Sequence, residues 1–362
     1  MSDPVVLDLK PETASQEQIG DVQMTITTKR NTYWKILNGI RYVIPYPRKV
    51  LNYVGVRISL LLRKPNHQFY PYKLGVEASS RCNLKCPLCP RTSDLNRSVG
   101  DMEFGRFKKM IGKMAPYLFQ VRFHGLGEPT LNRRLAEMIE YAHKKGIFTN
   151  FHTNGHFLTE ELINELISSG LDEINIALDG LTENIYGQYR VGGSAEKVKE
   201  GIIRFCRIKK ERNSKSPRVN LQFLVMSHNE HEIGALRTFA ASAGVDWVFL
   251  KTVNIMHGAD SGNKSYLPSE SKYSRYRTDK SDLELNTQYK CTRTFSELIV
   301  NWNGSISLCA CDDPESGKIK GNIFEDEIDT ILFGEDFVRA RSQSLKMEYE
   351  MCKYCVDAKS PV

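Results

Sequence analysis

Three cysteines lie close together near the end of the first quarter of the chain. Cys82, Cys86 and Cys89 fall within eight residues, with three residues in the first gap and two in the second. A cubane of four irons needs one thiolate for each iron, so three cysteines can hold three corners and leave the fourth iron open to a ligand. Structural zinc sites usually show two closely spaced cysteine pairs instead. The triplet therefore favours an iron–sulfur cluster with an open coordination site over a zinc ion.

Polar segments that can bind a ligand follow the triplet, each at the end of an expected strand. The run His124–Pro129 contains two glycines, which let a backbone approach a ligand closely. Thr153 and Asn154 end a later strand, Asp179 ends the next, and Arg190 follows. The cysteine spacing and the order of these segments resemble the radical S-adenosylmethionine (radical SAM) superfamily.

The resemblance implies cofactors and a reaction. In this family the amino and carboxylate groups of SAM chelate the open iron of a [4Fe–4S] cluster. One electron from the cluster cleaves SAM to a 5'-deoxyadenosyl radical, which abstracts hydrogen from a substrate C–H bond. The electron would come from a one-electron reductant such as flavodoxin or ferredoxin. A non-enzymatic iron–sulfur electron carrier is a rival hypothesis, but it would not need the residues that contact SAM.

The resemblance also implies roles for single residues. Gly127 and Glu128 would meet the amino group of SAM, and Arg190 would pair with its carboxylate. The other expected SAM contacts are Leu88, Thr153, Asn154 and Asp179.

Some positions depart from the family pattern. Leu126 replaces the first glycine of a pair, and Ala177 stands where relatives commonly have a serine. Leu88 replaces an aromatic residue that packs on adenine, and it can supply apolar contact without stacking. For Asp179 a turn-forming role and a ligand role both stay open.

Four more cysteines form a second group in the C-terminal quarter. They are Cys291, Cys309, Cys352 and Cys355. Two alternating apolar stretches around Asn303-Gly304 predict a β-hairpin, and four thiolates can close all corners of a cubane. The arrangement resembles the SPASM module in its shortened "twitch" form, which implies one auxiliary [4Fe–4S] cluster. A zinc ribbon built from Cys309, Cys311, Cys352 and Cys355 is the alternative.

The segments that must position these residues alternate between short apolar strands and helices, which argues for parallel βα units. The expected strands are 73–78, 119–123, 148–153, 173–178, 218–225 and 247–251. The expected helices are 104–114, 132–145, 160–169, 194–212 and 230–243. Six such repeats resemble the partial (β/α)6 barrel of radical SAM enzymes, an α/β relative of the TIM barrel with its chemistry at the carboxyl ends of the strands. The expected domains are an N-terminal basic segment (1–72), the partial barrel (73–280) and a small β-hairpin and helix module of SPASM/twitch type (281–362).

Charge and hydropathy give expectations about the cellular location of the protein and its partners. The first 25 residues hold no apolar signal segment, and cysteines clustered without a signal peptide favour metal sites in a reducing compartment, so a cytoplasmic location is expected.

Between Lys29 and Lys64 the chain has nine Lys or Arg and no Asp or Glu. The spacing of apolar residues there predicts two basic amphipathic helices, broken near Pro45 and Pro47, that either pack on the barrel or contact an anionic membrane peripherally. The net charge of +7 favours an anionic substrate, either a sugar or a peptide, and no nucleic-acid partner is expected.

The expected reaction is oxidation of a small molecule. An auxiliary cluster can accept an electron from the substrate, as in twitch enzymes that convert a sugar or aminocyclitol alcohol to a ketone. An epimerase, in which Cys311 returns hydrogen to the substrate radical, and a peptide maturase are the alternatives. Residues 1–72 lack the hairpin pattern of a winged-helix leader-binding domain, so none is expected. Lys251 is the second expected catalytic residue, and Asn254 and His257 follow it as candidate substrate contacts.

Overall fold

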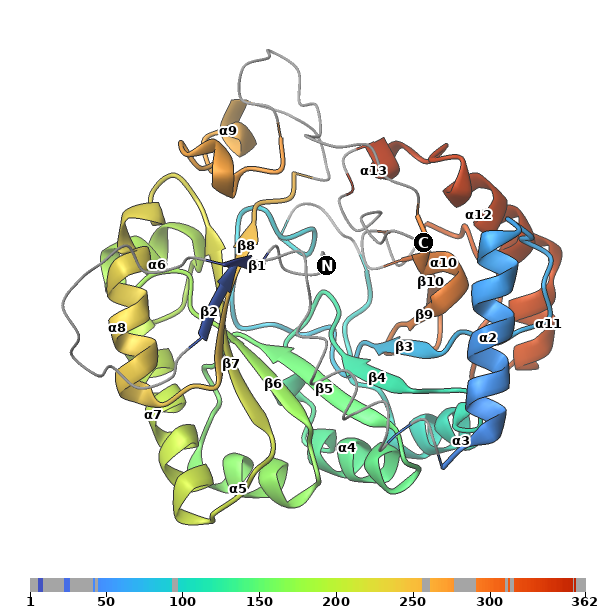
Figure 1. Ribbon diagram of the computed structural model, residues 1–362, viewed down its shortest axis with the longest axis horizontal. Helices are drawn as coiled ribbons and strands as arrows, with labels where there is room; N and C mark the ends of the chain where they lie inside the picture. The colour runs from blue at the N-terminus through green and yellow to red at the C-terminus, as the bar shows by residue number, and fades with distance from the viewer. Residues whose placement is uncertain are drawn as a thin grey trace.

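A curved and mostly parallel sheet forms the centre of the computed structural model (Figure 1). The structure describes residues 6–8, 23–26, 42, 45–92, 97–255, 261–276, 291–309, 312, 316–353 and 355. Its strands are β1 (Val6–Asp8), β2 (Gln23–Ile26), β3 (Lys73–Val76), β4 (Gln120–Phe123), β5 (Phe148–Thr153), β6 (Glu173–Ala177), β7 (Arg218–Val225), β8 (Trp247–Thr252), β9 (Glu297–Val300) and β10 (Ile306–Ser307). They lie in the order β1-β2-β8-β7-β6-β5-β4-β3-β9-β10, and those from β2 to β9 run parallel. The described strands form an open sheet with β1 and β10 at its edges, which is a partial barrel.

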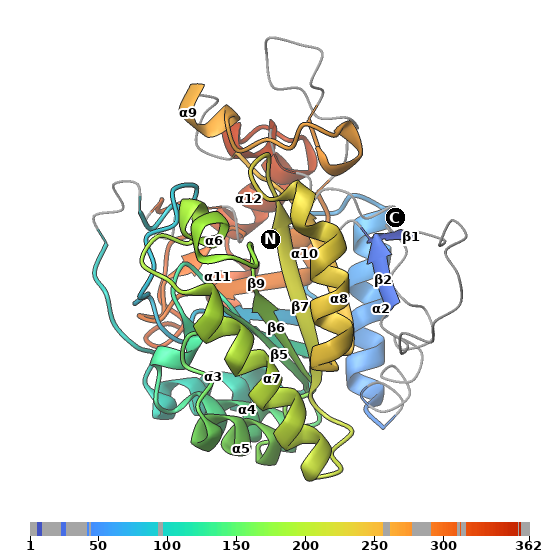
Figure 2. The ribbon, with the colours of Figure 1, turned by 90° about the vertical axis from the view of Figure 1, so that its left-hand side faces the viewer.

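Helices flank this sheet, and most of them cover its outer side, whereas the short α9 lies beyond the ends of the strands (Figure 1, Figure 2). They are α2 (Pro47–Leu61), α3 (Phe104–Met114), α4 (Leu135–Lys144), α5 (Glu160–Ser168), α6 (Glu183–Tyr189), α7 (Ala195–Glu211), α8 (Ile233–Ala243), α9 (Ser261–Lys264), α10 (Arg293–Ser296), α11 (Ile328–Phe333), α12 (Glu335–Leu345) and α13 (Glu350–Lys353). Short 3-10 turns are η1 (Pro129–Leu131), η2 (Glu230–Glu232) and η3 (Ser271–Tyr273). Among the described residues, none of the helices combines the length and the apolar character needed to cross a bilayer.

The sequence predicted the six βα units of the barrel closely. β5, β7 and α3 have the predicted bounds, and the other predicted strands and helices are shifted at their ends by three residues or fewer. The second of the two predicted N-terminal helices is α2, whereas the first lies mostly outside the described residues. The predicted hairpin is also present, because β10 pairs antiparallel with β9.

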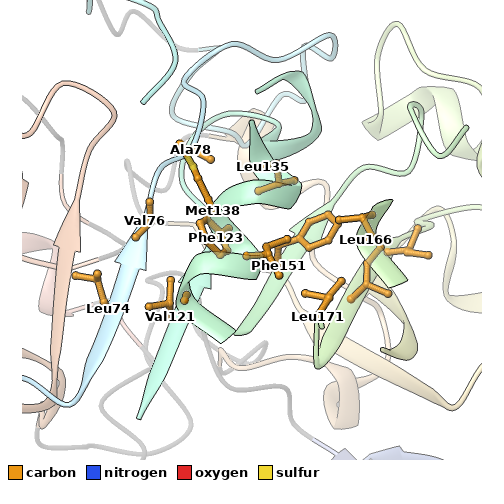
Figure 3. Close-up of a cluster of buried hydrophobic side chains, with 14 of the residues drawn as sticks. Leu74, Val76, Ala78, Val121, Phe123, Leu135, Met138, Phe151, Leu166 and Leu171 are labelled. Carbon is orange, nitrogen blue, oxygen red and sulfur yellow. The ribbon is translucent and has the colours of Figure 1, made fainter. Parts of the chain in front are cut away.

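The main core lies between the sheet and the outer helices (Figure 3). Val121 and Phe123 of β4 and Phe151 of β5 pack with Leu135 and Met138 of α4, and each is at most 1% exposed. Because side chains alternate along a strand, the residues between these apolar ones point to the inner side of the sheet.

This inner side is polar. Arg122 of β4 and Glu297 of β9 form a buried ion pair with an N–O distance of 2.5 Å. Burial alone would raise the pKa of Glu297, but the charges of Arg122 and Arg293 hold it below its ordinary value. Asn220 of β7 donates to Asn175 of β6 at 3.1 Å. Polar side chains placed on the inner side of the sheet can fix the orientation of a ligand.

The C-terminal module shares the sheet of the barrel. Leu298 of β9 lies in register with Leu74 of β3, and Val300 with Val76. Arg341 of α12 is fully buried and donates to the carbonyl oxygen of Pro65 at 3.2 Å. The module therefore packs against both β3 and the segment that precedes it.

Candidate active site

The three clustered cysteines lie on the loop that follows β3, where the backbone N–H of Cys89 donates to the carbonyl of Cys86 at 3.1 Å. They share one apolar cluster with Leu84, Leu88, Tyr189, Leu224, Met226, Val253, Ile255, Tyr266, Leu267 and Tyr276. Burial raises the pKa of the Cys82 and Cys89 thiols. A metal bound here would replace the thiol protons, since thiolates are the ligating form. The structure thus brings the predicted triplet together, with Leu88 beside it.

Two side chains direct N–H groups at the cysteine sulfurs. Nη1 of Arg190 lies 3.7 Å from Sγ of Cys86, and Nδ2 of Asn154 lies 3.8 Å from Sγ of Cys82. Hydrogen bonds to cluster sulfurs are one way in which proteins adjust reduction potential.

Asp179 holds Arg190 in this position. Nε and Nη2 of Arg190 lie 2.6 and 2.5 Å from Oδ2 of Asp179. The other carboxylate oxygen accepts a backbone N–H of β7 at 2.7 Å, and the side chain of Asp179 is fully buried. The sequence analysis predicted both residues as SAM contacts, and that role stays a prediction. It did not predict their contact with each other.

Glu128 is surrounded by hydrogen-bond donors. Its Oε1 accepts from the hydroxyls of Thr130 at 2.6 Å and Thr153 at 2.7 Å, and its Oε2 accepts from the backbone N–H of Asn154 at 2.8 Å. Burial raises the pKa of Glu128 although these hydrogen bonds oppose the rise. The carboxylate therefore ties the turn after β4 to the end of β5, and its predicted contact with the SAM amino group stays a prediction.

Gly127 lies against the chain that leads into the cysteine loop. A Cβ atom at this position would be 1.9 Å from the carbonyl oxygen of Ser79, which is backbone and cannot give way. The glycine is therefore required by close approach, whichever ligand the turn also contacts.

Gly127→Ala should lower the free energy of unfolding by about 3 kcal/mol, because the added carbon forces two backbone segments apart. Gly234→Ala on α8 is the matched control, since nothing lies within 4 Å of the added carbon. Urea titration of both variants measures the difference, with the control expected within about 0.5 kcal/mol of the parent. Equal stability of the two variants would contradict the close approach.

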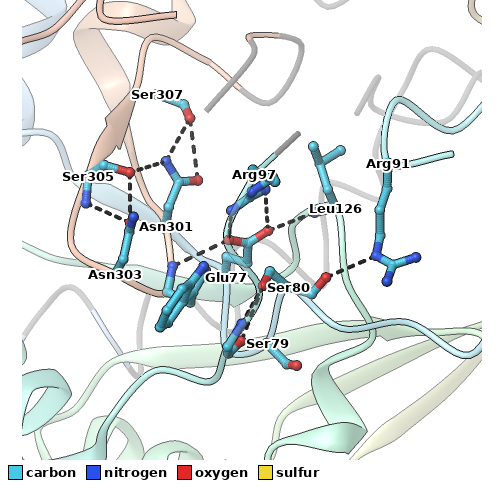
Figure 4. A network of polar contacts seen from close by, with 12 residues as sticks. Glu77, Ser79, Ser80, Arg91, Arg97, Leu126, Asn301, Asn303, Ser305 and Ser307 are labelled. Carbon is cyan, nitrogen blue, oxygen red and sulfur yellow. Dashed lines mark hydrogen bonds and ion pairs between the residues drawn. The ribbon is translucent and has the colours of Figure 1, made fainter. Parts of the chain in front are cut away.

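One buried carboxylate, missed by the sequence analysis, joins the cysteine loop, the turn after β4 and the C-terminal hairpin (Figure 4). Oε1 and Oε2 of Glu77 lie 3.0 and 2.5 Å from the guanidinium nitrogens of Arg97. Glu77 also accepts the backbone N–H groups of Leu126 and Trp302, each at 3.3 Å. In the sequence Glu77 is a single acid at the end of an expected strand, and nothing in the local pattern indicated this role.

Glu77→Gln should lower the free energy of unfolding by about 3 kcal/mol or more, because it leaves the buried Arg97 guanidinium without its counter-charge. Glu327→Gln is the matched control, because its ion pair with Lys113 is largely exposed and worth at most about 1 kcal/mol. Denaturant titration distinguishes the two, and similar losses for both variants would remove the structural role of Glu77.

The inner side of the sheet carries a group of basic side chains near the carboxyl ends of the strands. Nδ1 of His152 on β5 lies 3.2 Å from Oε1 of Gln222 on β7, and the rings of His124 and His152 meet edge to face at 6.2 Å. Burial lowers the pKa of both histidines well below the ordinary value, and the charges of Arg122 and Lys251 add to the effect. The predicted catalytic residue Lys251 thus lies by this group, and its role stays a prediction.

The other candidate residues beyond β8 are only partly described. Oδ1 of Asn254 accepts the hydroxyl of Tyr276 at 3.1 Å. His257 and Cys311 lie outside the described residues, so both predictions about them stay open.

The second cysteine group lines one pocket in the C-terminal module. All four predicted cysteines contribute to its wall, with Arg293, Thr294, Leu308, Ser344, Met347 and Met351. Within the described part of the chain, no three His, Cys, Asp or Glu side chains converge as the ligands of a single metal ion would. Four soft thiol donors around one pocket fit a cluster whose irons each take one ligand.

Two family models match the chain. The radical SAM superfamily model covers residues 76–240, and an iron–sulfur cluster-binding domain model, SPASM, covers residues 291–356. The first region contains the cysteine triplet and the strand ends around it, and the second contains the other four predicted ligands.

Curated relatives match parts of the chain. The tungsten-containing aldehyde ferredoxin oxidoreductase cofactor-modifying protein of Pyrococcus furiosus is 30% identical over 179 residues, which are 48% of this chain and 49% of the relative. A PqqA peptide cyclase of Bradyrhizobium diazoefficiens is 30% identical over 138 residues, which are 38% of this chain and 36% of the relative. The match thus spans about half of the first relative's length and about a third of the second's.

Among solved structures, Streptococcus suis SuiB bound to S-adenosylmethionine covers 91% of this chain and 78% of its own, with a TM-score of 0.59 and 15% identity. This likeness shows the fold. The two matched family models place this parallel partial barrel, with its thiol triplet after β3 and its cysteine-lined C-terminal module, among the iron–sulfur enzymes that use SAM. The chain belongs to the radical SAM superfamily and carries a C-terminal SPASM domain. Its cofactors are SAM and [4Fe–4S] clusters.

Proposed function

We propose that this radical SAM enzyme modifies and oxidises a peptide. The observation that carries the proposal is the sequence similarity to PqqA peptide cyclases, whose name gives a peptide as the target. The relative from Pyrococcus furiosus is named for a different role, so the substrate class rests on the cyclases. These comparisons favour the peptide alternative over the sugar or aminocyclitol dehydrogenation predicted from sequence.

In this proposal the two cysteine groups hold the two clusters. Cys82, Cys86 and Cys89 would bind the SAM cluster, and the four C-terminal cysteines would bind the auxiliary cluster. When bound, the two clusters and SAM would supply the electron that cleaves SAM, the radical that abstracts hydrogen, and an acceptor for one substrate electron.

The surrounding side chains position the cysteine loop and the ends of the strands, and one of them takes up a proton. Asp179 holds the guanidinium of Arg190 beside Cys86, and Glu128 fixes the backbone of Asn154. His152 is kept neutral by burial and lies on the inner side of the sheet, with its Nδ1 at Gln222. We assign its Nε2 as the acceptor of the proton that leaves the substrate as it is oxidised.

The test uses anaerobically reconstituted protein, SAM and dithionite. Short peptides encoded beside its gene are added in turn, with nucleotide sugars as the comparison substrates. We expect 5'-deoxyadenosine formation to increase with one peptide, and mass spectrometry to show the loss of two hydrogen atoms from it. Conversion of a sugar with no effect of any peptide would overturn the proposed substrate class.

A further inference from the structure

Helix α2 is fixed to the molecule by its more polar side. Nζ of Lys49 donates to the carbonyl of Gly146 at 2.7 Å, and the amide of Asn52 pairs with both backbone groups of Tyr70 at 2.8 and 2.9 Å. At Gly55 the helix lies so close to Phe69 that a Cβ atom would be 2.3 Å from its ring. The buried residues of α2 are Lys49, Asn52, Gly55, Val56, Ser59 and Leu60.

The outward side of α2 is the more apolar one. Leu51, Val54, Ile58 and Leu61 are 72%, 45%, 49% and 61% exposed, and Leu62 just beyond the helix is 60% exposed. Their spacing of three, four and three residues places the four helical ones on one stripe. Six of the ten large apolar side chains that are exposed among the described residues lie between positions 51 and 62. This pattern is the reverse of an ordinary surface helix, and such a patch marks an interaction site.

Basic residues flank the stripe along the chain. Arg48, Arg63 and Lys64 are exposed, Arg57 is half-buried, and the sequence has no acid between positions 29 and 64. A second copy of the chain on this stripe would bring the same cations face to face, which opposes self-association. An anionic bilayer complements both features, because apolar side chains enter the lipid boundary while long basic side chains reach the headgroups.

We propose that the stripe formed by Leu51, Val54, Ile58, Leu61 and Leu62, with its flanking arginines and lysines, docks this enzyme on an anionic membrane surface. Helix α2 then lies flat on the bilayer at the outer edge of the molecule (Figure 1). Among the described residues, the opposite side of α2 packs on the molecule, so only the outward side would enter the lipid boundary.

Co-sedimentation of the full-length, reconstituted protein with vesicles tests this docking. Vesicles of phosphatidylcholine mixed with phosphatidylglycerol should bind the protein at least about tenfold more tightly than phosphatidylcholine alone, and added salt should weaken binding. Ile58→Gln should weaken binding severalfold, and Leu51→Gln/Ile58→Gln/Leu61→Gln by at least about tenfold. Ile203→Gln on α7 is the matched control, because Ile203 is also a helical isoleucine that is 49% exposed.

The outcomes are distinguishable because these substitutions are on the surface and should leave thermal unfolding unchanged. Binding lost in the triple variant but kept in Ile203→Gln supports the docking. Equal binding by all variants, or no preference for the anionic vesicles, overturns it. A concentration-dependent dimer that the triple variant abolishes, with no vesicle binding, would assign the stripe to a second copy and also overturn the proposal.

Discussion

Replacement of Cys86 by alanine should abolish SAM cleavage. Cys86 is the buried member of the triplet, and its sulfur lies beside the Arg190 guanidinium. Without it the SAM cluster would keep only two thiolate ligands, so the iron content of reconstituted protein should fall from about eight to about four atoms per chain. The assay is 5'-deoxyadenosine formed from SAM after reduction with dithionite, which we expect to fall to background.

Cys206→Ala is the matched control for this experiment. Cys206 lies on α7 and packs against the main core, and burial raises the pKa of its thiol to about 12, so it is an inert neutral group. The control should keep its iron and its SAM cleavage. Cleavage that persists in Cys86→Ala would refute the assignment of the triplet.

Replacement of Cys355 by alanine should block product formation but retain SAM cleavage, unlike the replacement of Cys86, which should abolish SAM cleavage. Cys355 lines the C-terminal pocket with the other three cysteines of its group, and the triplet belongs to a separate apolar cluster. We expect Cys355→Ala to lose about four irons, to keep forming 5'-deoxyadenosine, and to release no oxidised peptide.

The same Cys206→Ala control applies, and it should form product at the parental rate. Full product yield from Cys355→Ala would remove the electron-accepting role of the second cluster. Loss of SAM cleavage together with product would instead indicate that the C-terminal module supports the barrel structurally.

The sequence predicted the barrel well where short-range signals determine the structure. The β7 segment Arg218–Val225 is a run of strand-forming residues, and α3 starts where Glu103 accepts the N–H groups of Gly105 and Arg106. Cysteine spacing identified the triplet for a similar reason, since a single loop that holds a cluster presents its thiols at short intervals. The C-terminal cysteines, spread from Cys291 to Cys355, were predicted from the resemblance to the SPASM module.

Contacts between distant segments could not be predicted in the same way. β2 and β9 extend the parallel sheet beyond the six predicted strands, because pairing partners depend on the whole topology rather than on local pattern. In the sequence Glu77 is a polar residue at the end of an expected strand. In the structure it contacts Arg97 and Trp302, which lie in two other parts of the chain. The outward orientation of the apolar side of α2 could not be predicted either, since amphipathic spacing does not tell which side of a helix packs against the protein.

The parallel pairing of β9 with β3 has a consequence for any attempt to divide this protein. The two regions that the family models match are hydrogen-bonded neighbours in one sheet. A shortened chain that stops before residue 291 would leave the backbone groups of β3 unpaired along a bare apolar edge, which is a template for aggregation. The barrel and its iron–sulfur module should accordingly be soluble and cooperative only when they are expressed as one polypeptide.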